Sequence, residues 1–600
     1  MPLTPDHLER RYYYRGVGGI LLARTSTFDF SGAITGNDRE LGAIRFTNIG
    51  QHPIVSLWSE DVVRYLQEVL GEIPWERFFP IRVEVVWPYV DDTLNEKRKA
   101  VVLIVEVPQG AMGTDEAETA AAVAWKCRTV LNVFRIVDVE VEVRAIDRQM
   151  CAMDAGLESS IQQQDWGRED LAFSSKVDLT LDSFLPALSH IGYQITPEFE
   201  ASNRYGTMGA HLRLEQSPSR VYGLTCRHVV HKHEAGFGSN KRGFWLADGE
   251  SYVHDGDTSL GDGRQKHRVL QMCKDSLQRL QMDVDVELEG AEKELRTLTL
   301  ASTKYTSDPK SFPEPTTSDI NDLKSLEKAL PELRKVHAML TDERMEEDDA
   351  RAIGHVFAMS PLDISSKRPE ETSGGFLRDW ALVQLDQAKF DACGVKNQIF
   401  VSHRNLHDLR KLARRYEGLK PMALFISENR DSEGFVRLRG DSKTGRRNDE
   451  YTSIAVGKRG AATNLTFGIT NEIKAVVRVN YGRREVAWEW IVVSPEPSAP
   501  FAKPGDSGSV IFDSDGSVIG LISGGCSKGS EARRLRRESS AGGGFLSGRD
   551  ESEGEGRDHY DQTPDGFARC PPSTDLTFAT PIHAVLEDIE LITKSGVRFL

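Results

Sequence analysis

A serine between two glycines, in the run Pro504-Gly505-Asp506-Ser507-Gly508, is the residue of this sequence best suited to covalent chemistry. Apolar residues follow it and Asp515-Gly516 comes next, so the run predicts a tight turn that leads into a β-hairpin. A hydroxyl on such a turn is exposed, and the neighbouring backbone N–H groups can bind a developing oxyanion. The run alone is equally typical of a surface loop, so its interpretation as a nucleophile depends on other parts of the chain.

Two further stretches could activate that hydroxyl. A serine is a strong nucleophile only when a neighbouring base takes its proton and a carboxylate orients the base. His228 lies at the end of the apolar run Val221–Val230, and Asp379 precedes the apolar run Trp380–Leu385. With Ser507, these residues occur in the order His, Asp, Ser within one β-rich region, which favours a catalytic triad.

The three blocks resemble those of the trypsin-like serine peptidases, which carry Leu-Thr-Ala-Ala-His, Asp-Ile-Ala-Leu and Gly-Asp-Ser-Gly. Residues 456–468 are similar to the K-x-G-x-x-T-G-x-T-x-G strand pair of the bacterial and intracellular branches, and residues 578–582 to the strand before the terminal helix. The resemblance covers about residues 195 to 600, apart from a helical insertion and a loop over 527–574. Residues 1–150 lie outside it.

The resemblance implies an endopeptidase that works through an acyl-enzyme, without metal or cofactor. His228 would act as general base and then acid, Asp379 would hold its tautomer, and Ser507 would attack the carbonyl carbon. The backbone N–H groups of Gly505 and Ser507 would form the oxyanion hole. The substrate-binding residues would be Phe501, Ser523 and Gly524.

Two departures from the secreted members bear on regulation. Val229 follows the histidine where secreted enzymes have a cysteine, which indicates an intracellular type without their disulfides. No Ile-Val-Gly-Gly sequence after a basic residue precedes His228. We therefore do not expect activation by cleavage, in which Asp506 pairs with a new N-terminus.

The length of the chain predicts a multidomain protein, because 600 residues are more than one hydrophobic core usually organises. Residues 1–150 read as a small α/β domain with a β–β–α–β order, and residues 151–190 as a connector. The region 191–600 reads as an all-β, chymotrypsin-like double β-barrel, with strands that include Met422–Ser427. Leucine stripes predict a helical hairpin inserted over 262–345. The Gly/Ser/Arg-rich segment 527–574 predicts a disordered loop.

Charge and cysteine content indicate which partners and which cellular location to expect. The formal net charge of −16 argues against general nucleic-acid binding, which needs a basic face. No apolar run reaches the length of about 18 residues that a membrane span needs, and no secretion signal is apparent. Seven scattered cysteines without a CxxC pair fit reduced thiols. We expect a cytoplasmic or nuclear protein.

The sequence gives little support for a metal site. His228, His231 and His233 could suggest a metal site, but strand alternation does not bring all three to one face. Asp513–Gly516 begins like a calcium loop, yet its glycine comes too early and no glutamate takes the twelfth position.

The rival interpretation is a latent or inactive protease-like scaffold. It would bind protein partners through the helical insertion or residues 1–150, whereas an active enzyme binds a protein or peptide substrate.

Overall fold

The computed structural model divides the chain into two compact units. The first comprises Met1–Gln149, Glu496–Pro500 and Cys526–Asp575, and the second comprises Met150–Pro495, Phe501–Gly525 and Leu576–Leu600. The structure describes residues 5, 9–10, 13–14, 19–26, 43–86, 99–108, 112, 115–146, 153–154, 191–198, 204–231, 251–253, 267–342, 345, 347–365, 375–390, 394–432, 434–440, 453–478, 486–495, 500–527 and 574–600.

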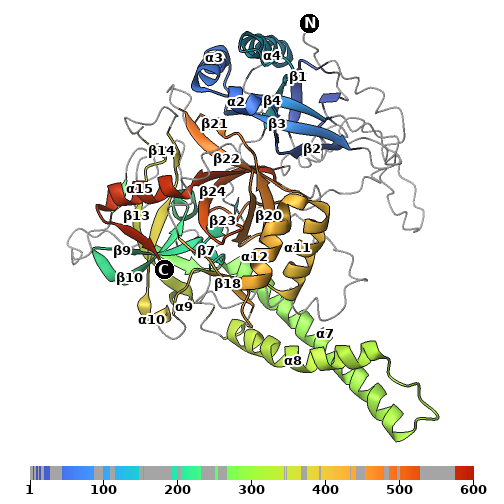
Figure 1. Ribbon diagram of the computed structural model, residues 1–600. Coiled ribbons are helices and arrows are strands. Elements are labelled where there is room, and N and C mark those ends of the chain that lie inside the picture. The colour runs from blue at the N-terminus through green and yellow to red at the C-terminus, as the bar shows by residue number, and fades with distance from the viewer. Residues whose placement is uncertain are drawn as a thin grey trace, which may run out of the picture. The chain divides into compact units, whose positions relative to one another are not determined.

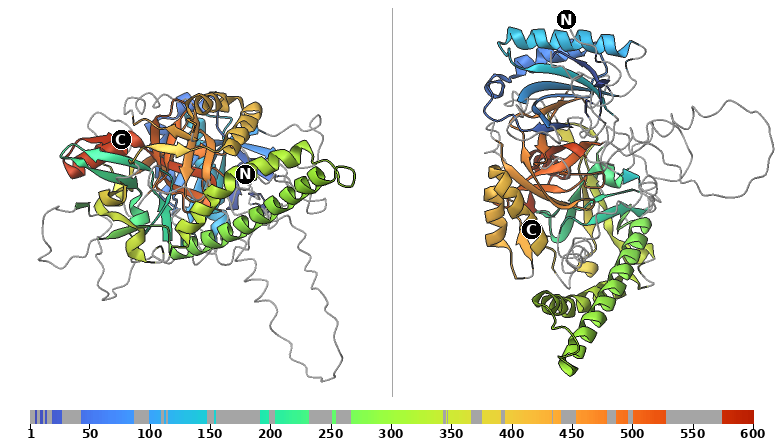
Figure 2. Two further views of the ribbon diagram at one scale, coloured as in Figure 1. Left: turned by 90° about the horizontal axis from the view of Figure 1, so that it is seen from below. Right: turned by 90° about the vertical axis from the view of Figure 1, so that its right-hand side faces the viewer.

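The first unit is an α/β sheet with helices on one face. Its strands run in the order β1-β5-β4-β3, and β2 also pairs with β3. The strands are β1 (Ile20–Arg24), β2 (Ala43–Thr47), β3 (Arg77–Val86), β4 (Lys99–Pro108) and β5 (Glu140–Ile146), and the helices are α2 (Ile54–Leu57), α3 (Glu60–Leu70) and α4 (Glu116–Val133). Helix α4 connects the parallel strands β4 and β5 and lies along the sheet (Figure 2).

The centre of the second unit is a closed antiparallel barrel of six strands. Its order is β22-β20-β19-β23-β24-β25, and β25 pairs back to β22. The strands are β19 (Ala455–Gly460), β20 (Asn464–Thr470), β22 (Ala487–Val493), β23 (Val510–Asp513), β24 (Val518–Ser527) and β25 (Thr574–Pro581), with β21 (Ala475–Val477) beside β22. Val456, Trp490 and Ile511 contribute to one apolar core, in which alternate residues of these strands meet.

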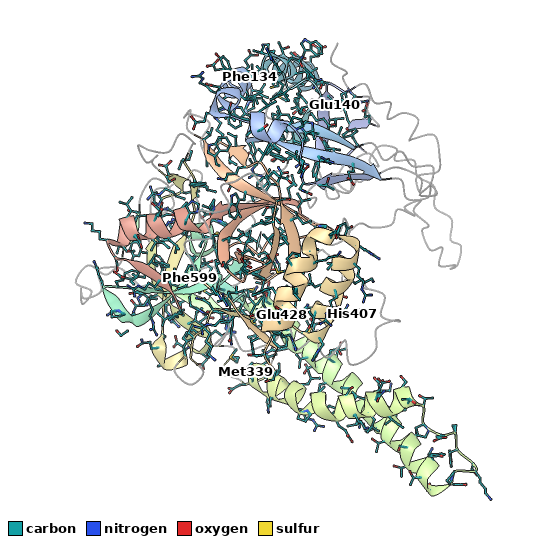
Figure 3. The ribbon with its side chains drawn as sticks, in the orientation of Figure 1. Phe134, Glu140, Met339, His407, Glu428 and Phe599 are labelled. Carbon is teal, nitrogen blue, oxygen red and sulfur yellow. The ribbon has the colours of Figure 1, made fainter. Side chains whose placement is uncertain are left out.

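The other sheet of this unit is a curled half-barrel. Its order is β26-β9-β10-β16-β13-β12-β7-β8-β6, and β11 pairs with β13. The strands are β6 (Met153–Asp154), β7 (Gln194–Pro197), β8 (Arg204–Thr207), β9 (Ala210–Leu214), β10 (Ser217–Thr225), β11 (Tyr252–Val253), β12 (Arg268–Gln271), β13 (Ala352–Met359), β16 (Ala381–Leu385) and β26 (Val597–Phe599). Phe599 of β26, labelled in Figure 3, packs so close to Gly440 that any β-carbon there would meet its ring.

The second unit also contains further helices and short strands outside these two sheets. They include α6 (Arg227–Val230), α9 (Asp348–Arg351), β14 (Asp363–Ile364), β15 (Leu377–Arg378), α10 (Gln387–Phe390), β17 (Gln398–Phe400), α11 (His403–Arg415), the 3-10 helix Glu417–Leu419, α12 (Lys420–Asn429), β18 (Phe435–Arg437) and α15 (Ile582–Thr593). A barrel and a half-barrel are compatible with the expected double β-barrel. Within the described residues, no helix has the length and apolar character needed to cross a bilayer.

One predicted strand is wrong. Residues Met422–Ser427 belong to helix α12, which buries Met422, Ala423 and Ile426. These buried positions recur at helical spacing, and Pro421 lies in the first turn, where its missing N–H has no cost. The short apolar run Met422–Ile426 does not by itself separate a strand from a buried helix.

Two long helices, α7 (Lys274–Ser307) and α8 (Thr317–Leu340), form a hairpin within the range expected for the insertion (Figure 1). Leu277, Val284 and Ala291 of α7 recur every seven residues and pack against Leu326, Leu330, Leu333 and Leu340 of α8. A hydrogen-bonded capping box between Thr316 and Asp319 begins α8. The core of the hairpin is therefore its own leucine seam.

Several expectations lie outside the described residues. They concern residues 528–573 of the predicted loop, residues 155–190 of the connector, and His233.

A buried histidine in β9 is expected to make the stability of the second unit dependent on pH. Burial lowers the pKa of His211 to about 4, although a hydrogen bond with the Lys396 carbonyl opposes the shift. The stability that neutral His211 provides is complete above its ordinary pKa of 6.5, and it is lost as pH falls towards 4. We expect His211→Gln to remove about 2 kcal/mol of the decline in unfolding free energy between about pH 7.5 and about pH 5.

Urea unfolding of wild type and variant at the two pH values measures this contribution. His407→Gln is the matched control, because His407 is exposed on α11 (Figure 3). An equal decline in wild type and His211→Gln would show that His211 takes up no proton on unfolding.

Candidate active site

His228 and Asp379 form a buried, doubly hydrogen-bonded pair. Strand β10 ends at Thr225, and His228 lies in the single turn of α6 that follows. The His228 backbone N–H donates to Asp379 Oδ1 at 3.0 Å, and His228 Nδ1 bonds to Asp379 Oδ2. The side chains are about 1% exposed. The carboxylate therefore fixes both the position and the ring orientation of the imidazole.

The charge state of Asp379 follows from its neighbours. Burial alone would raise the pKa of this carboxyl, but the charge and hydrogen bonds of His228 outweigh it, and Arg227 adds to the effect. The pKa of Asp379 is consequently lowered, so the group is ionised at neutral pH. An ionised Asp379 can stabilise an imidazolium at His228.

Ser507 lies on the glycine turn, packed against the segment that carries His228. A β-carbon added at Gly508 would lie 2.3 Å from Thr225 Oγ1 and 3.2 Å from the Cys226 backbone nitrogen. The turn thus needs glycine at 508, where φ is +89°. Ser507 itself is fully buried, and its Oγ has no hydrogen-bond partner among the described residues. The structure brings His228 and Asp379 into hydrogen-bonded contact, whereas Ser507 makes no such bond to His228.

The backbone around Ser507 is held from the half-barrel. Thr207 of β8 donates its N–H to the Ser507 carbonyl at 2.8 Å and its hydroxyl to the Gly505 carbonyl at 2.9 Å. Gly505 has a φ of +99°, a conformation that favours glycine. Thr207 thus binds the carbonyls of both residues. The N–H groups of Gly505 and Ser507, in contrast, make no hydrogen bond to the described residues. These are the two donors expected for an oxyanion hole.

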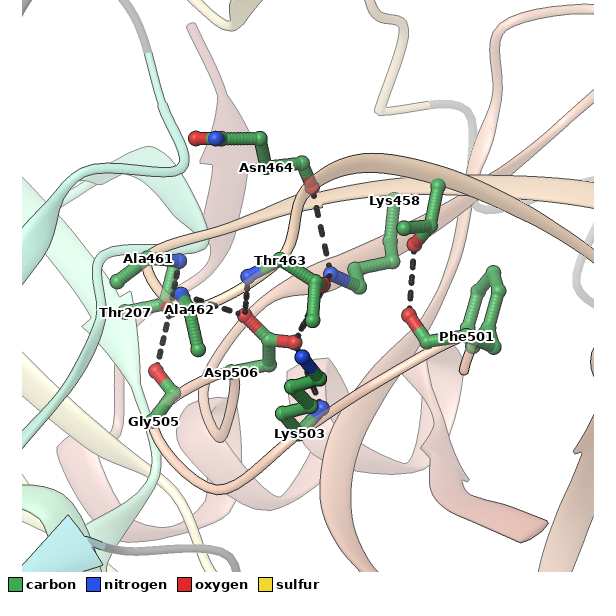
Figure 4. A network of polar contacts seen from close by, with 11 residues as sticks. Thr207, Lys458, Ala461, Ala462, Thr463, Asn464, Phe501, Lys503, Gly505 and Asp506 are labelled. Atoms are coloured by element: carbon green, nitrogen blue, oxygen red, sulfur yellow. Dashed lines mark hydrogen bonds and ion pairs between the residues drawn. The ribbon is translucent and has the colours of Figure 1, made fainter. Parts of the chain in front are cut away.

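A buried ion pair anchors the residue between those donors. Lys458 Nζ of β19 lies 3.0 Å from Asp506 Oδ2, and both side chains are fully buried (Figure 4). The Asp506 carboxylate also accepts from the backbone of Ala462, Thr463 and Lys503 at 2.9 to 3.1 Å, and from Thr463 Oγ1 at 2.6 Å. A carboxylate with this many donors and a cationic partner is well compensated for burial.

The β19–β20 turn supplies most of these donors. Asn464 takes a φ of +54° at the place where the family pattern has glycine, and asparagine tolerates that left-handed conformation. Its carbonyl accepts from Lys458 Nζ at 3.3 Å. Residues 456–468, which were singled out by resemblance alone, thus supply most of the donors around Asp506.

The expected substrate-binding residues divide into two groups. Ser523 of β24 donates to Glu489 Oε1 at 2.6 Å, and a β-carbon at the next residue, Gly524, would meet no described atom within 4 Å. No described atom therefore fills the space beside Gly524. Phe501 instead packs in the interior of the barrel against residues such as Trp490 and Val492. That placement gives Phe501 a packing role and does not support a role at the floor of a substrate pocket.

Three potential metal ligands lie together at this site, and they differ from the set His228, His231 and His233. Among the described residues, ligand atoms of Cys226, His228 and Asp379 lie within 4.8 Å of one another. The direct bond between His228 Nδ1 and Asp379 leaves no space for an ion between those atoms, and the Cys226 thiol donates to the Ile522 carbonyl at 3.1 Å. His231 is buried at the end of α6. The arrangement favours acid–base chemistry.

Sequence reasoning missed two functional candidates. Lys458 lies in the stretch 456–468 that resembles the family motif. A lysine in the buried strand Ala455–Gly460 could have indicated its role. Asp588 in α15 contacts both neighbours of Asp379 from more than 200 residues away. Nothing local in the sequence marks such a contact.

No protein-family model matches the chain, and no curated protein is significantly similar to it.

Proposed function

We propose that this protein is a trypsin-like serine endopeptidase with a chymotrypsin-like arrangement of its barrel and half-barrel. The observation that carries the proposal is the buried His228–Asp379 pair beside a glycine turn, in which Gly505 and Ser507 offer two backbone donors. The order of the three residues along the chain supports it. Protein or peptide would be the substrate.

The proposed reaction transfers an acyl group twice. His228 Nε2 takes the hydroxyl proton of Ser507 while Oγ bonds to the scissile carbonyl carbon, whose oxygen becomes the oxyanion. The N–H groups of Gly505 and Ser507 stabilise that oxyanion, and Asp379 stabilises the imidazolium. The C–N bond then breaks, and His228 gives its proton to the leaving amine. Water repeats the sequence on the ester, which releases the acid and restores Ser507.

The Lys458–Asp506 pair supports an enzyme that needs no activating cleavage. In the resembled secreted enzymes, a newly formed N-terminal amine pairs with the aspartate before the nucleophile. Here an ammonium group from the chain itself already lies 3.0 Å from Asp506. Asp506 is therefore held without a cut, and so is the turn with both oxyanion donors.

A latent site is the second candidate, and one observation favours it. Ser507 is fully buried and its Oγ has no partner in the described part of the chain. A latent protein would need a partner or substrate to expose the hydroxyl and turn it towards His228. In that case, residues 1–150 or the α7–α8 hairpin would be the regions to test for partner binding.

A fluorophosphonate probe separates the two candidates. The probe phosphonylates a serine only when base and oxyanion hole are assembled, so we expect an adduct that peptide mass spectrometry places on Ser507. His228→Ala should prevent the adduct. A folded wild-type protein that stays unlabelled, and cleaves no peptide from a proteome-derived library, would favour the latent site.

A further inference from the structure

We infer that Asp588, on the C-terminal helix α15, is a positioning residue that fixes Asp379 for the reaction. The inference rests on the proposed function for its catalytic consequence, and on the contacts of Asp588 for its geometry. Asp588 touches neither substrate nor Ser507. It acts through the residues immediately before and after Asp379.

The carboxylate of Asp588 binds both of those residues. Arg378 Nε donates to Asp588 Oδ2 at 2.9 Å, and a second guanidinium nitrogen lies 2.8 Å from Oδ1, so the pair is bidentate. The indole N–H of Trp380 donates to Oδ2 at 2.7 Å. Trp380 and Asp588 are 1% and 7% exposed, which strengthens these charge-assisted bonds.

The segment around Asp379 has other contacts as well, because β15 pairs with β14 and the Leu377 carbonyl accepts from Thr580 Oγ1 at 3.3 Å. This segment lies between β15, of only two residues, and β16, which begins at Ala381. Ser360 adds a further contact, because its Oγ accepts the Trp380 N–H at 3.0 Å and its N–H donates to the Trp380 carbonyl at 3.0 Å. The carbonyl of Ser360 accepts from Arg227, the residue before His228.

These contacts connect His228 and Asp379 by two routes. One route runs from Asp588 through Trp380 and Ser360 to Arg227, beside His228. The other is the direct bond between His228 and Asp379. Helix α15 is fixed in turn by buried Ile582, Val585 and Ile589, so Asp588 has a rigid base.

Asp588→Asn tests the inference, because it keeps the size of the side chain and removes its charge. The matched control is Glu590→Gln, since Glu590 is exposed on the same helix and contacts only the backbone of Val597 among the described residues. Trp380→Phe removes one donor and keeps an aromatic ring in the core. Two readouts are compared in variants with unchanged thermal midpoints: the fluorophosphonate labelling rate and the downfield proton NMR signal of the His228–Asp379 hydrogen bond, assigned by its loss in His228→Ala.

We expect labelling of Asp588→Asn to slow by about tenfold to 100-fold, the scale on which small misplacements act. The downfield signal should shift or disappear in Asp588→Asn, shift less in Trp380→Phe, and remain in Glu590→Gln. Rate and signal unchanged in folded Asp588→Asn and Trp380→Phe would overturn the inference, and so would absence of the signal in the wild type. An unlabelled wild type whose signal still depends on Asp588 would favour the latent site over an active peptidase and leave the positioning role intact.

Discussion

Ser507→Ala is expected to abolish fluorophosphonate labelling and to lower peptide hydrolysis by roughly 10⁴- to 10⁶-fold, the scale on which loss of a triad nucleophile acts in serine peptidases. The reason is chemical, because without Oγ no acyl-enzyme can form. The proposed oxyanion donors at 505 and 507 belong to the backbone and survive the change, so we expect a small residual rate. Rates on a fluorogenic peptide found by library profiling give the measurement.

Ser509→Ala is the matched control for this loss. Ser509 lies two residues away, is also fully buried, and its Oγ also has no partner among the described residues. The two variants therefore remove the same atom from similar surroundings. We expect Ser509→Ala to keep labelling and hydrolysis within a few-fold of wild type. Equal activity of Ser507→Ala and wild type would contradict the assignment of the nucleophile.

Lys458→Met is expected to lower the free energy of unfolding by about 3–5 kcal/mol, because it leaves the buried carboxylate of Asp506 without its cationic partner. Methionine has nearly the length of lysine, so the cavity contribution is small. The displaced carboxylate would also pull on the turn that carries Gly505 and Ser507. Urea unfolding and labelling rate, measured on the same preparations, should therefore both decline.

The double variant Lys458→Met/Asp506→Asn tests the electrostatic origin of that loss. An asparagine oxygen still accepts from the backbone donors of Ala462 and Thr463, while the unpaired charge is gone. We expect the double variant to be more stable than Lys458→Met alone. A loss below about 1 kcal/mol in Lys458→Met, the range of exposed ion pairs, would show that the pair is not buried in solution.

The candidate residues of this site can be selected from sequence alone, whereas the residues that hold them in place cannot. His228, Asp379 and Ser507 each lie in a short block whose pattern is local, and alternating apolar runs are enough to indicate β-sheets. Helix α12 was missed because its apolar run is too short to separate helical from strand periodicity. The role of Lys458 depends on a strand pairing that brings β19 beside β23, and the role of Asp588 depends on where the last helix docks. Both are tertiary facts.

The lysine that pairs with Asp506 has a consequence for timing. Lys458 and Asp506 are 48 residues apart and meet only when β19 has paired with β23. If the proposed activity is correct, the oxyanion turn matures in the same event that pairs β19 with β23. Such a chain would be competent as soon as it has folded after synthesis. Its activity in a cell could then be controlled only through its abundance, its location or access to its buried serine.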